Sequence, residues 1–214
     1  FSYRKLSREN RLTYDVLDYY LELSKKESDY LLYEEPMGTV SGVQTQIPVL
    51  LSEYQFQSKE DVDAYLELMK TTPDYFNSLI AFEQEKAQKG LFMASYTADT
   101  VIEQCQAFID MGDSNYLIST FVDRIQKLTD LSESEKSDYI QKNAYMLQTY
   151  VLPAYQQLIK TVVELKESGK NEEGLCYLPN GKEYYELTVQ ASTGSARTVP
   201  QLQKLTKNQM KDDL

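Results

Sequence analysis

Along most of this chain the hydrophobic residues recur every three or four positions, a pattern that predicts helices rather than strands. The first such stretch runs from Lys5 to Tyr33, with no proline or glycine inside it. We expect one helix of about seven or eight turns there. It should end at Glu35, because the residue before Pro36 avoids the helical region.

Residues 37–57 have a different pattern. Their apolar side chains lack helical spacing, and Gly38, Gly42 and Pro48 interrupt the segment. We expect an extended, partly buried segment with a short strand or a helical turn after Pro48. Long ordered loops are often functional, but the pattern fits equally well a loop that merely crosses the helices.

Terminal residues predict the next helices. Ser58 with Asp61 is typical of an N-cap, and Thr72-Pro73 places proline at the first helical position, where no hydrogen bond is lost. The expected starting residues are Ser58, Thr72, Thr97 or Asp99, and Ser114. Gly90 and Gly112 are expected at helix C-termini.

The longest helix begins at Ser132, where Ser132 and Glu135 form a capping box. Its apolar face continues to Ser168-Gly169, over about ten turns. Pro153 lies inside it and should kink it, because the proline ring clashes with the carbonyl four residues earlier.

A turn signal, Pro179-Asn180-Gly181, directly precedes the pair Tyr184-Tyr185. One of these rings can pack inward while the other faces elsewhere, and a structural role remains the alternative to a functional one. Residues 183–193 fit either a strand or a helix, and we favour a helix because every neighbouring segment is helical. A last amphipathic helix starts at Val199-Pro200 and carries Leu202, Leu205 and Met210.

These elements predict an all-α fold: a bundle of long helices with one irregular Pro/Gly-containing segment near residues 34–57. We expect a single domain over residues 1–214, since this length supports one sizeable core. The chain does not begin with methionine, and we expect it to be an internal piece of a longer protein.

Charge excludes some partners. The net charge of −11 would repel a phosphate backbone, so nucleic acid is not an expected partner. No run of eighteen apolar residues occurs, so no transmembrane segment is predicted.

The sequence contains no histidine, which excludes a histidine-dependent catalytic triad or a histidine-ligated zinc within these residues. No catalytic residue, metal ligand or cofactor is therefore assigned in the chain. Neighbouring acidic pairs are expected by chance in a chain with 33 acidic residues, and Cys105 lies on an apolar helix face where a buried thiol is expected.

Several short motifs, taken in order, resemble the bacterial domain-of-unknown-function family numbered 885. The motifs are Pro36-Met37 with Gly42 and Ile47-Pro48; Asp61 with Tyr65-Leu66; Pro73 with Phe76; Gly90; Pro153-Ala154-Tyr155; Leu178-Pro179 with Gly181 and Tyr184-Tyr185; and Thr193-Gly194. The resemblance implies a helical, zincin-like metallopeptidase that is secreted or lipid-anchored at the cell envelope. The family's zinc ligands and catalytic glutamate lie on a His-Glu…His helix, and no position of this sequence matches that motif.

If the resemblance holds, the chain is the N-terminal or middle portion of the enzyme, inactive alone. Its partners would be the missing C-terminal half and a peptide substrate, and zinc would bind in the full-length protein. The candidate substrate-cleft residues are Met37, Gly42, Gly181, Tyr184 and Tyr185, because they lie in irregular backbone among long helices. An exposed face at Leu202, Leu205 and Met210 would permit self-association of the chain.

The competing interpretation is a non-catalytic extracytoplasmic helical module that binds a ligand or serves as a scaffold. Such a module needs no metal, and the absence of histidine suits it directly.

Overall fold

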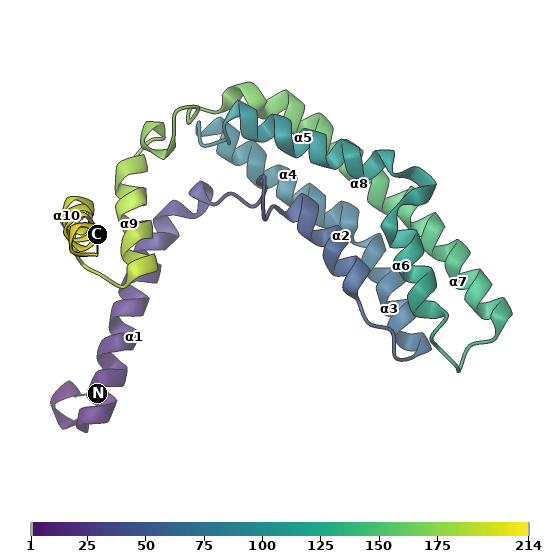
Figure 1. Ribbon diagram of the computed structural model, residues 1–214, viewed down its shortest axis with the longest axis horizontal. Helices are drawn as coiled ribbons and strands as arrows, with labels where there is room; N and C mark the ends of the chain where they lie inside the picture. The colour runs from purple at the N-terminus through teal and green to yellow at the C-terminus, as the bar shows by residue number, and fades with distance from the viewer. Residues whose placement is uncertain (1, 214) are drawn as a thin grey trace. The chain divides into compact units, whose positions relative to one another are not determined.

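The computed structural model describes residues 2–213, and within this range every regular element is helical (Figure 1). The predicted all-α fold is confirmed. The chain divides into two compact units: unit 1 comprises Phe1–Glu34 with Glu173–Leu214, and unit 2 comprises Glu35–Glu172. The single domain predicted over residues 1–214 stays a prediction.

Unit 1 is built on α1, which packs against α9. Its elements are the 3-10 turn η1 (Tyr3–Lys5), α1 (Arg8–Glu27), η2 (Ser28–Tyr33), η6 (Leu175–Tyr177), α9 (Gly181–Thr193) and α10 (Val199–Asp212). The helix predicted from Lys5 to Tyr33 is confirmed in its centre, but both ends tighten into 3-10 geometry. Tyr30, with φ −117° and ψ 19°, interrupts the helical backbone near the C-terminal end.

The last two helices of unit 1 agree with the sequence. Residues 183–193 are helical, and α9 ends at Gly194, whose φ is 63°. Helix α10 begins at Val199 with a capping box formed by Thr198 and Gln201. No residue of α10 is buried.

Unit 2 contains a single buried core that spans its helices. The elements are α2 (Val43–Glu53), α3 (Lys59–Lys70), α4 (Thr72–Gln88), α5 (Ser95–Asp110), η3 (Gly112–Ser114), α6 (Tyr116–Ile125), α7 (Glu133–Met146), the π-helical turn η4 (Leu147–Val151), α8 (Leu152–Leu165) and η5 (Lys166–Ser168). Helix α8 packs along both α4 and α5 (Figure 1). Phe76, Phe121 and Tyr155 are among the largest fully buried side chains of the core.

The extended segment predicted over residues 37–57 is wrong over Val43–Glu53, which form α2, while residues 54–57 are non-helical as expected. Pro48 lies inside this helix and cannot donate to the carbonyl of Gln44, four residues earlier. The Tyr155 hydroxyl on α8 donates to that carbonyl instead, at 2.6 Å. A long-range bond thus replaces the missing helical one, and the irregular backbone is confined to residues 34–42 and 54–57 on either side of α2.

Most helix starts are confirmed. Capping boxes form at Ser58 with Asp61 and at Ser132 with Glu135, and α4 has proline in its first turn. Two starts differ. Helix α5 begins at Ser95, before Thr97, and α6 is capped by Asn115, whose side chain accepts from the backbone N–H of Leu117. Asn115 is thus the N-cap in place of the predicted Ser114, and its side-chain amide also donates to the carbonyl of Phe108.

The long helix from Ser132 to Ser168 is confirmed, with one change of geometry. Directly before Pro153, residues Leu147–Val151 form a π-helical turn. Pro153 lacks the N–H that the carbonyl four residues earlier would accept from, so the backbone widens at this point. The sequence predicted a kink at this proline, and the structure shows a π turn.

Candidate functional site

The segment Leu178–Tyr185 is fixed by close backbone contact within unit 1. Asn180 adopts a left-handed conformation with φ 49°, and Gly181 starts α9. A Cβ at Gly181 would lie 1.9 Å from the carbonyl oxygen of Leu175, so only glycine fits there. The predicted turn is therefore present and is held against η6.

Tyr184 belongs to a cluster of three tyrosine rings. Its ring centroid lies 5.4 Å from that of Tyr30 and 4.8 Å from that of Tyr33, and these two are 5.1 Å apart. The Tyr33 hydroxyl donates to the carbonyl of Pro179. The cluster links η2 to the turn before α9, which gives Tyr184 a packing role.

Tyr185 faces elsewhere and is 50% exposed. It lines a shallow depression of about 530 Å³ between η6, α9 and the start of α10. The other lining residues are Leu175, Cys176, Lys182, Glu186, Val199, Pro200 and Gln203. The two neighbouring rings thus separate, one packed and one available to solvent.

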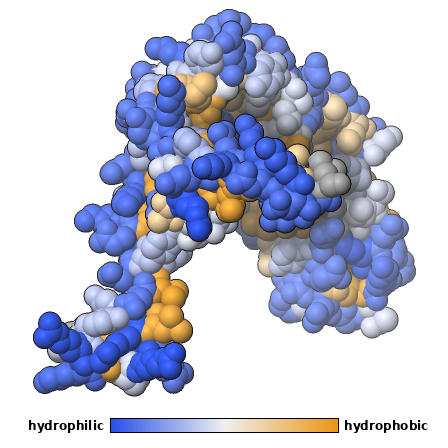
Figure 2. All heavy atoms as spheres, turned by 60° about the vertical axis from the view of Figure 1, so that its left-hand side comes forward, coloured by the Kyte–Doolittle hydropathy of each residue, from blue (hydrophilic) through white to orange (hydrophobic). Residues whose placement is uncertain are grey.

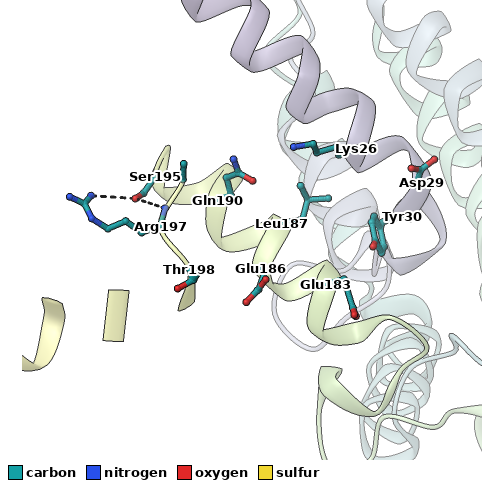
Figure 3. A pocket seen from close by; sticks show the side chains of 11 residues that line it. Lys26, Asp29, Tyr30, Glu183, Glu186, Leu187, Gln190, Ser195, Arg197 and Thr198 are labelled. Carbon is teal, nitrogen blue, oxygen red and sulfur yellow. Dashed lines mark hydrogen bonds between the residues drawn. The ribbon is translucent and has the colours of Figure 1, made fainter. Parts of the chain in front are cut away.

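A second pocket of unit 1, of about 390 Å³, lies between α1 with η2 on one side and α9 with residues 195–198 on the other (Figure 3). Its charged lining residues carry both signs: the cations are Lys26 and Arg197, and the acids are Asp29, Glu183 and Glu186. Leu187 and Tyr30 add apolar surface. We call this the α1–α9 pocket.

Arg197 is weakly held in the α1–α9 pocket. Its guanidinium lies 3.5 Å from the Ser195 hydroxyl oxygen, and its backbone N–H donates to the same oxygen (Figure 3). Sequence reasoning missed this pocket because its walls lie far apart in the chain. The local signal was the short connection Ser195-Ala196-Arg197 between the helix-ending glycine Gly194 and the capping threonine Thr198.

Met37 and Gly42 lie in unit 2, where they make packing contacts. Met37 is fully buried in the core. A Cβ at Gly42 would lie 2.4 Å from the backbone nitrogen of Gly38. Gln44 ties this turn together by donating to the carbonyl of Gly38 at 2.6 Å and to Gln104 at 2.8 Å. The assignment of these residues to a substrate cleft stays a prediction.

Unit 2 also contains a charged cluster, with buried Lys86 and Glu83 and exposed Glu35, that the sequence did not indicate. The Lys86 ammonium is completely buried and lies 3.0 Å from a Glu35 oxygen and 3.6 Å from a Glu83 oxygen. Burial raises the pKa of Glu83 to about 7, although the charge of Lys86 opposes this. Burial also raises the pKa of Glu35, again opposed by Lys86.

Metal and thiol chemistry have no evident site in the described residues. Between residues 2 and 213, no group of three or more His, Cys, Asp or Glu side chains is placed to hold a metal ion. Cys105 is buried as predicted, and burial raises the pKa of its thiol to about 12, whereas Cys176 is exposed. The residues present do not fit a zinc centre.

No helix within the same range has the length and apolar character that crossing a bilayer requires.

Comparisons with known proteins place these features in context. The model of the family described as "Bacterial protein of unknown function (DUF885)" matches residues 1–213. No curated protein matches the chain. A crystal structure of the "putative lipoprotein" from Colwellia psychrerythraea is similar, with a TM-score of 0.74 and 18% identity, over 78% of this chain. That likeness shows a shared fold, and it spans 29% of the length of the other protein.

Proposed function

Because this chain belongs to the DUF885 family of bacterial proteins, we propose that it is the helical, non-metal-binding part of a zinc metallopeptidase. In this proposal the zinc ligands and the catalytic glutamate lie outside these 214 residues, on a His-Glu…His helix. The chain contributes to the substrate cleft and is inactive alone. The sequence itself contains no histidine that could serve the metal.

The observation that carries a role in substrate binding is the composition of the α1–α9 pocket. A peptide presents a carboxylate, an ammonium and amide groups. A site that binds it therefore needs positive and negative charges as well as hydrogen-bond donors and acceptors. Lys26 and Arg197 can attract a carboxylate, while Glu183 and Glu186 can accept hydrogen bonds from an ammonium. Pockets that recognise small ligands combine a few such polar groups with apolar walls, here Tyr30 and Leu187.

The proposal places the protein at the cell envelope. The similar protein from Colwellia psychrerythraea carries a lipoprotein description, which supports an extracytoplasmic location without specifying the anchor. A peptidase there would act on peptides outside the cytoplasm. Fractionation of cells that express the full-length protein tests this, and recovery in the cytoplasm alone would contradict it.

The first test of the function is the coding sequence that continues from this chain. A His-Glu…His helix encoded within the following couple of hundred residues supports the peptidase. A stop codon or an unrelated domain supports the alternative, a non-catalytic extracytoplasmic binding or scaffolding module, which the absence of histidine favours.

The second test is kinetic and uses the full-length protein with a peptide that has a free carboxyl terminus. We expect Lys26→Met and Arg197→Met each to raise KM about tenfold with kcat little changed, because a charge-assisted hydrogen bond to the substrate is lost. Lys25→Met is the matched control, since Lys25 is an exposed neighbour on α1 that does not line the pocket. Equal KM values for all three variants and the parent would refute a role for this pocket.

A further inference from the structure

The stretch of α1 from Leu12 to Leu21 exposes an unusual amount of apolar surface. The exposed fractions are 66% for Leu12, 60% for Val16, 52% for Leu17, 61% for Tyr20 and 62% for Leu21. We call these five residues the α1 apolar face, and an apolar area is visible along this limb of unit 1 in Figure 2. Single exposed apolar residues are ordinary, but a contiguous set on one helix marks an interaction surface.

This surface continues an interface that the structure already contains. Leu12, Val16 and Leu23 are spaced by four and seven residues, so they share one side of the helix. Leu23 is 8% exposed in the C-terminal half of α1, the helix that α9 packs against, and Leu187 is buried on α9. Along this side of α1, exposure therefore increases from buried Leu23 to exposed Val16 and Leu12.

The turn that precedes α1 does not provide the cover. The Tyr3 hydroxyl donates to Asp15 at 2.8 Å, and Arg11 donates to the carbonyl of Arg4 at 2.8 Å. The ring of Tyr3 packs edge-on against Tyr14, with centroids 5.2 Å apart. These contacts hold η1 against α1 while Leu12 and Val16 stay exposed.

The similar structure belongs to a longer protein, which offers a candidate cover for the α1 apolar face. The chain spans 29% of the Colwellia protein, so this fold occurs there as part of a much longer polypeptide. We propose that the α1 apolar face is an internal interface, which packs against an apolar surface of the polypeptide outside these 214 residues. A stable interface buries about 800 Å² on each side, and the five exposed side chains of the α1 apolar face would form part of such an area.

The inference rests on the proposed function only in requiring a longer protein. It needs no zinc and no peptidase activity, so the two fail separately. A longer protein without a His-Glu…His helix would refute the peptidase and leave the interface intact.

Cysteine labelling tests the interface directly. In a Cys176→Ser background, Val16→Cys and Leu21→Cys place single thiols on the α1 apolar face, while buried Cys105 stays unreactive. The rate of maleimide modification is measured on the α1 peptide by mass spectrometry, in this 214-residue chain and in the full-length protein. We expect both thiols to react at least about tenfold more slowly in the full-length protein, because an interface core excludes solvent.

Glu22→Cys is the matched control on the same helix, since Glu22 is exposed and outside the apolar face. Its rate should differ less than about twofold between the two proteins. Equal rates at all three positions would overturn the inference. So would full protection already present in the 214-residue chain, because a second copy or other residues of this chain would then cover the face.

A stability measurement supplies an independent readout. Leu17→Asp should lower the Tm of the full-length protein but leave that of the 214-residue chain unchanged, since Leu17 is half-exposed there. An equal loss in both proteins would show that Leu17 supports α1 itself, and this would also overturn the inference.

Discussion

Unit 2 buries many apolar side chains, whereas unit 1 buries few. Every residue of the buried core cluster lies in unit 2, between Met37 and Val162. In unit 1 the buried apolar side chains are few, namely Leu23, Tyr33, Leu178 and Leu187, and α10 buries none. Unit 2 has a core of its own, whereas unit 1 leaves pockets and apolar side chains exposed to solvent, where other molecules or segments can bind.

The difference separates stability from recognition within one chain. Buried apolar area is the main favourable contribution to folding, so unit 2 should determine the unfolding free energy. The α1–α9 pocket and the α1 apolar face both belong to unit 1. Substitutions should therefore have large thermodynamic effects in unit 2 and small ones in unit 1, and four predictions test this.

The largest effect is expected at the centre of unit 2. Phe121 is fully buried and packs against Tyr65 and Phe56, with ring centroids 5.6 Å and 5.3 Å away. Phe121→Ala should lower the free energy of unfolding by about 3–5 kcal/mol, because it leaves a cavity. Chemical denaturation measures this, with Leu12→Ala in unit 1 as a control that should change it by less than about 0.5 kcal/mol. Equal losses would abolish the contrast.

The second effect depends on pH and arises from Glu83. Its folded pKa of about 7 lies above the ordinary value of 4.5, so the folded protein binds the proton more tightly than the unfolded chain. The contribution of Glu83 to the free energy of unfolding is fully present below about pH 4.5 and is lost as the pH rises through 7. We expect unfolding at pH 8 to require about 2 kcal/mol less than at pH 5 because of this group.

Glu83→Gln should remove most of that difference between pH 5 and pH 8. Glu85→Gln is the matched control, because Glu85 is an exposed residue of the same helix that pairs with Lys89. A wild-type protein whose unfolding free energy is the same at both pH values would contradict the burial of an ionisable Glu83. Denaturant titrations at the two pH values decide the question.

The third effect concerns the bond that allows Pro48 inside α2. Tyr155→Phe deletes the hydroxyl that donates to the carbonyl of Gln44 and leaves that carbonyl unpaired. The unfolding free energy should fall by about 1–3 kcal/mol. Tyr96→Phe, at a ring that is 60% exposed, should have almost no effect. A Tyr155→Phe variant as stable as wild type would show that α2 does not depend on this bond.

The same bond shows why the sequence predicted some features and missed others. Capping boxes at Ser58 and Ser132 involve residues three positions apart, so they can be read from a short window. Helix α2 was missed because its proline is compensated by the bond from Tyr155 to Gln44, two residues that are 111 positions apart. Local signals located most helix ends, but no local signal reveals a distant donor.

The candidate site, too, was predictable only where its residues are close together in the sequence. The turn before α9 was predictable because Pro179, Asn180 and Gly181 are contiguous, and the separation of Tyr184 from Tyr185 follows from their adjacency on a helix. The α1–α9 pocket joins residues from 26 to 198, and the Glu35–Lys86 ion pair joins two segments that look like ordinary polar surface. The pocket and the ion pair form only when the fold brings these distant residues together, so no short stretch of sequence predicts them.

The smallest effect on stability, and the sharpest test of recognition in unit 1, concerns the two tyrosines. Tyr184 contributes its ring to the cluster with Tyr30 and Tyr33, and Phe would preserve that packing, so Tyr184→Phe should change the unfolding free energy by less than about 0.5 kcal/mol. Tyr185→Phe should be equally neutral, because its ring is half-exposed.

If the full-length protein is the proposed peptidase, the hydroxyls should matter for turnover. A tyrosine hydroxyl that donates to the developing oxyanion contributes about tenfold or more to kcat, and exposed Tyr185 is the better placed of the two. We therefore expect Tyr185→Phe to lower kcat more than Tyr184→Phe does, with KM little changed in either variant. Steady-state kinetics on the two variants measures this. Unchanged turnover in both would exclude these tyrosines from the substrate cleft, and unit 1 would then contribute to recognition only through its pocket and its apolar face.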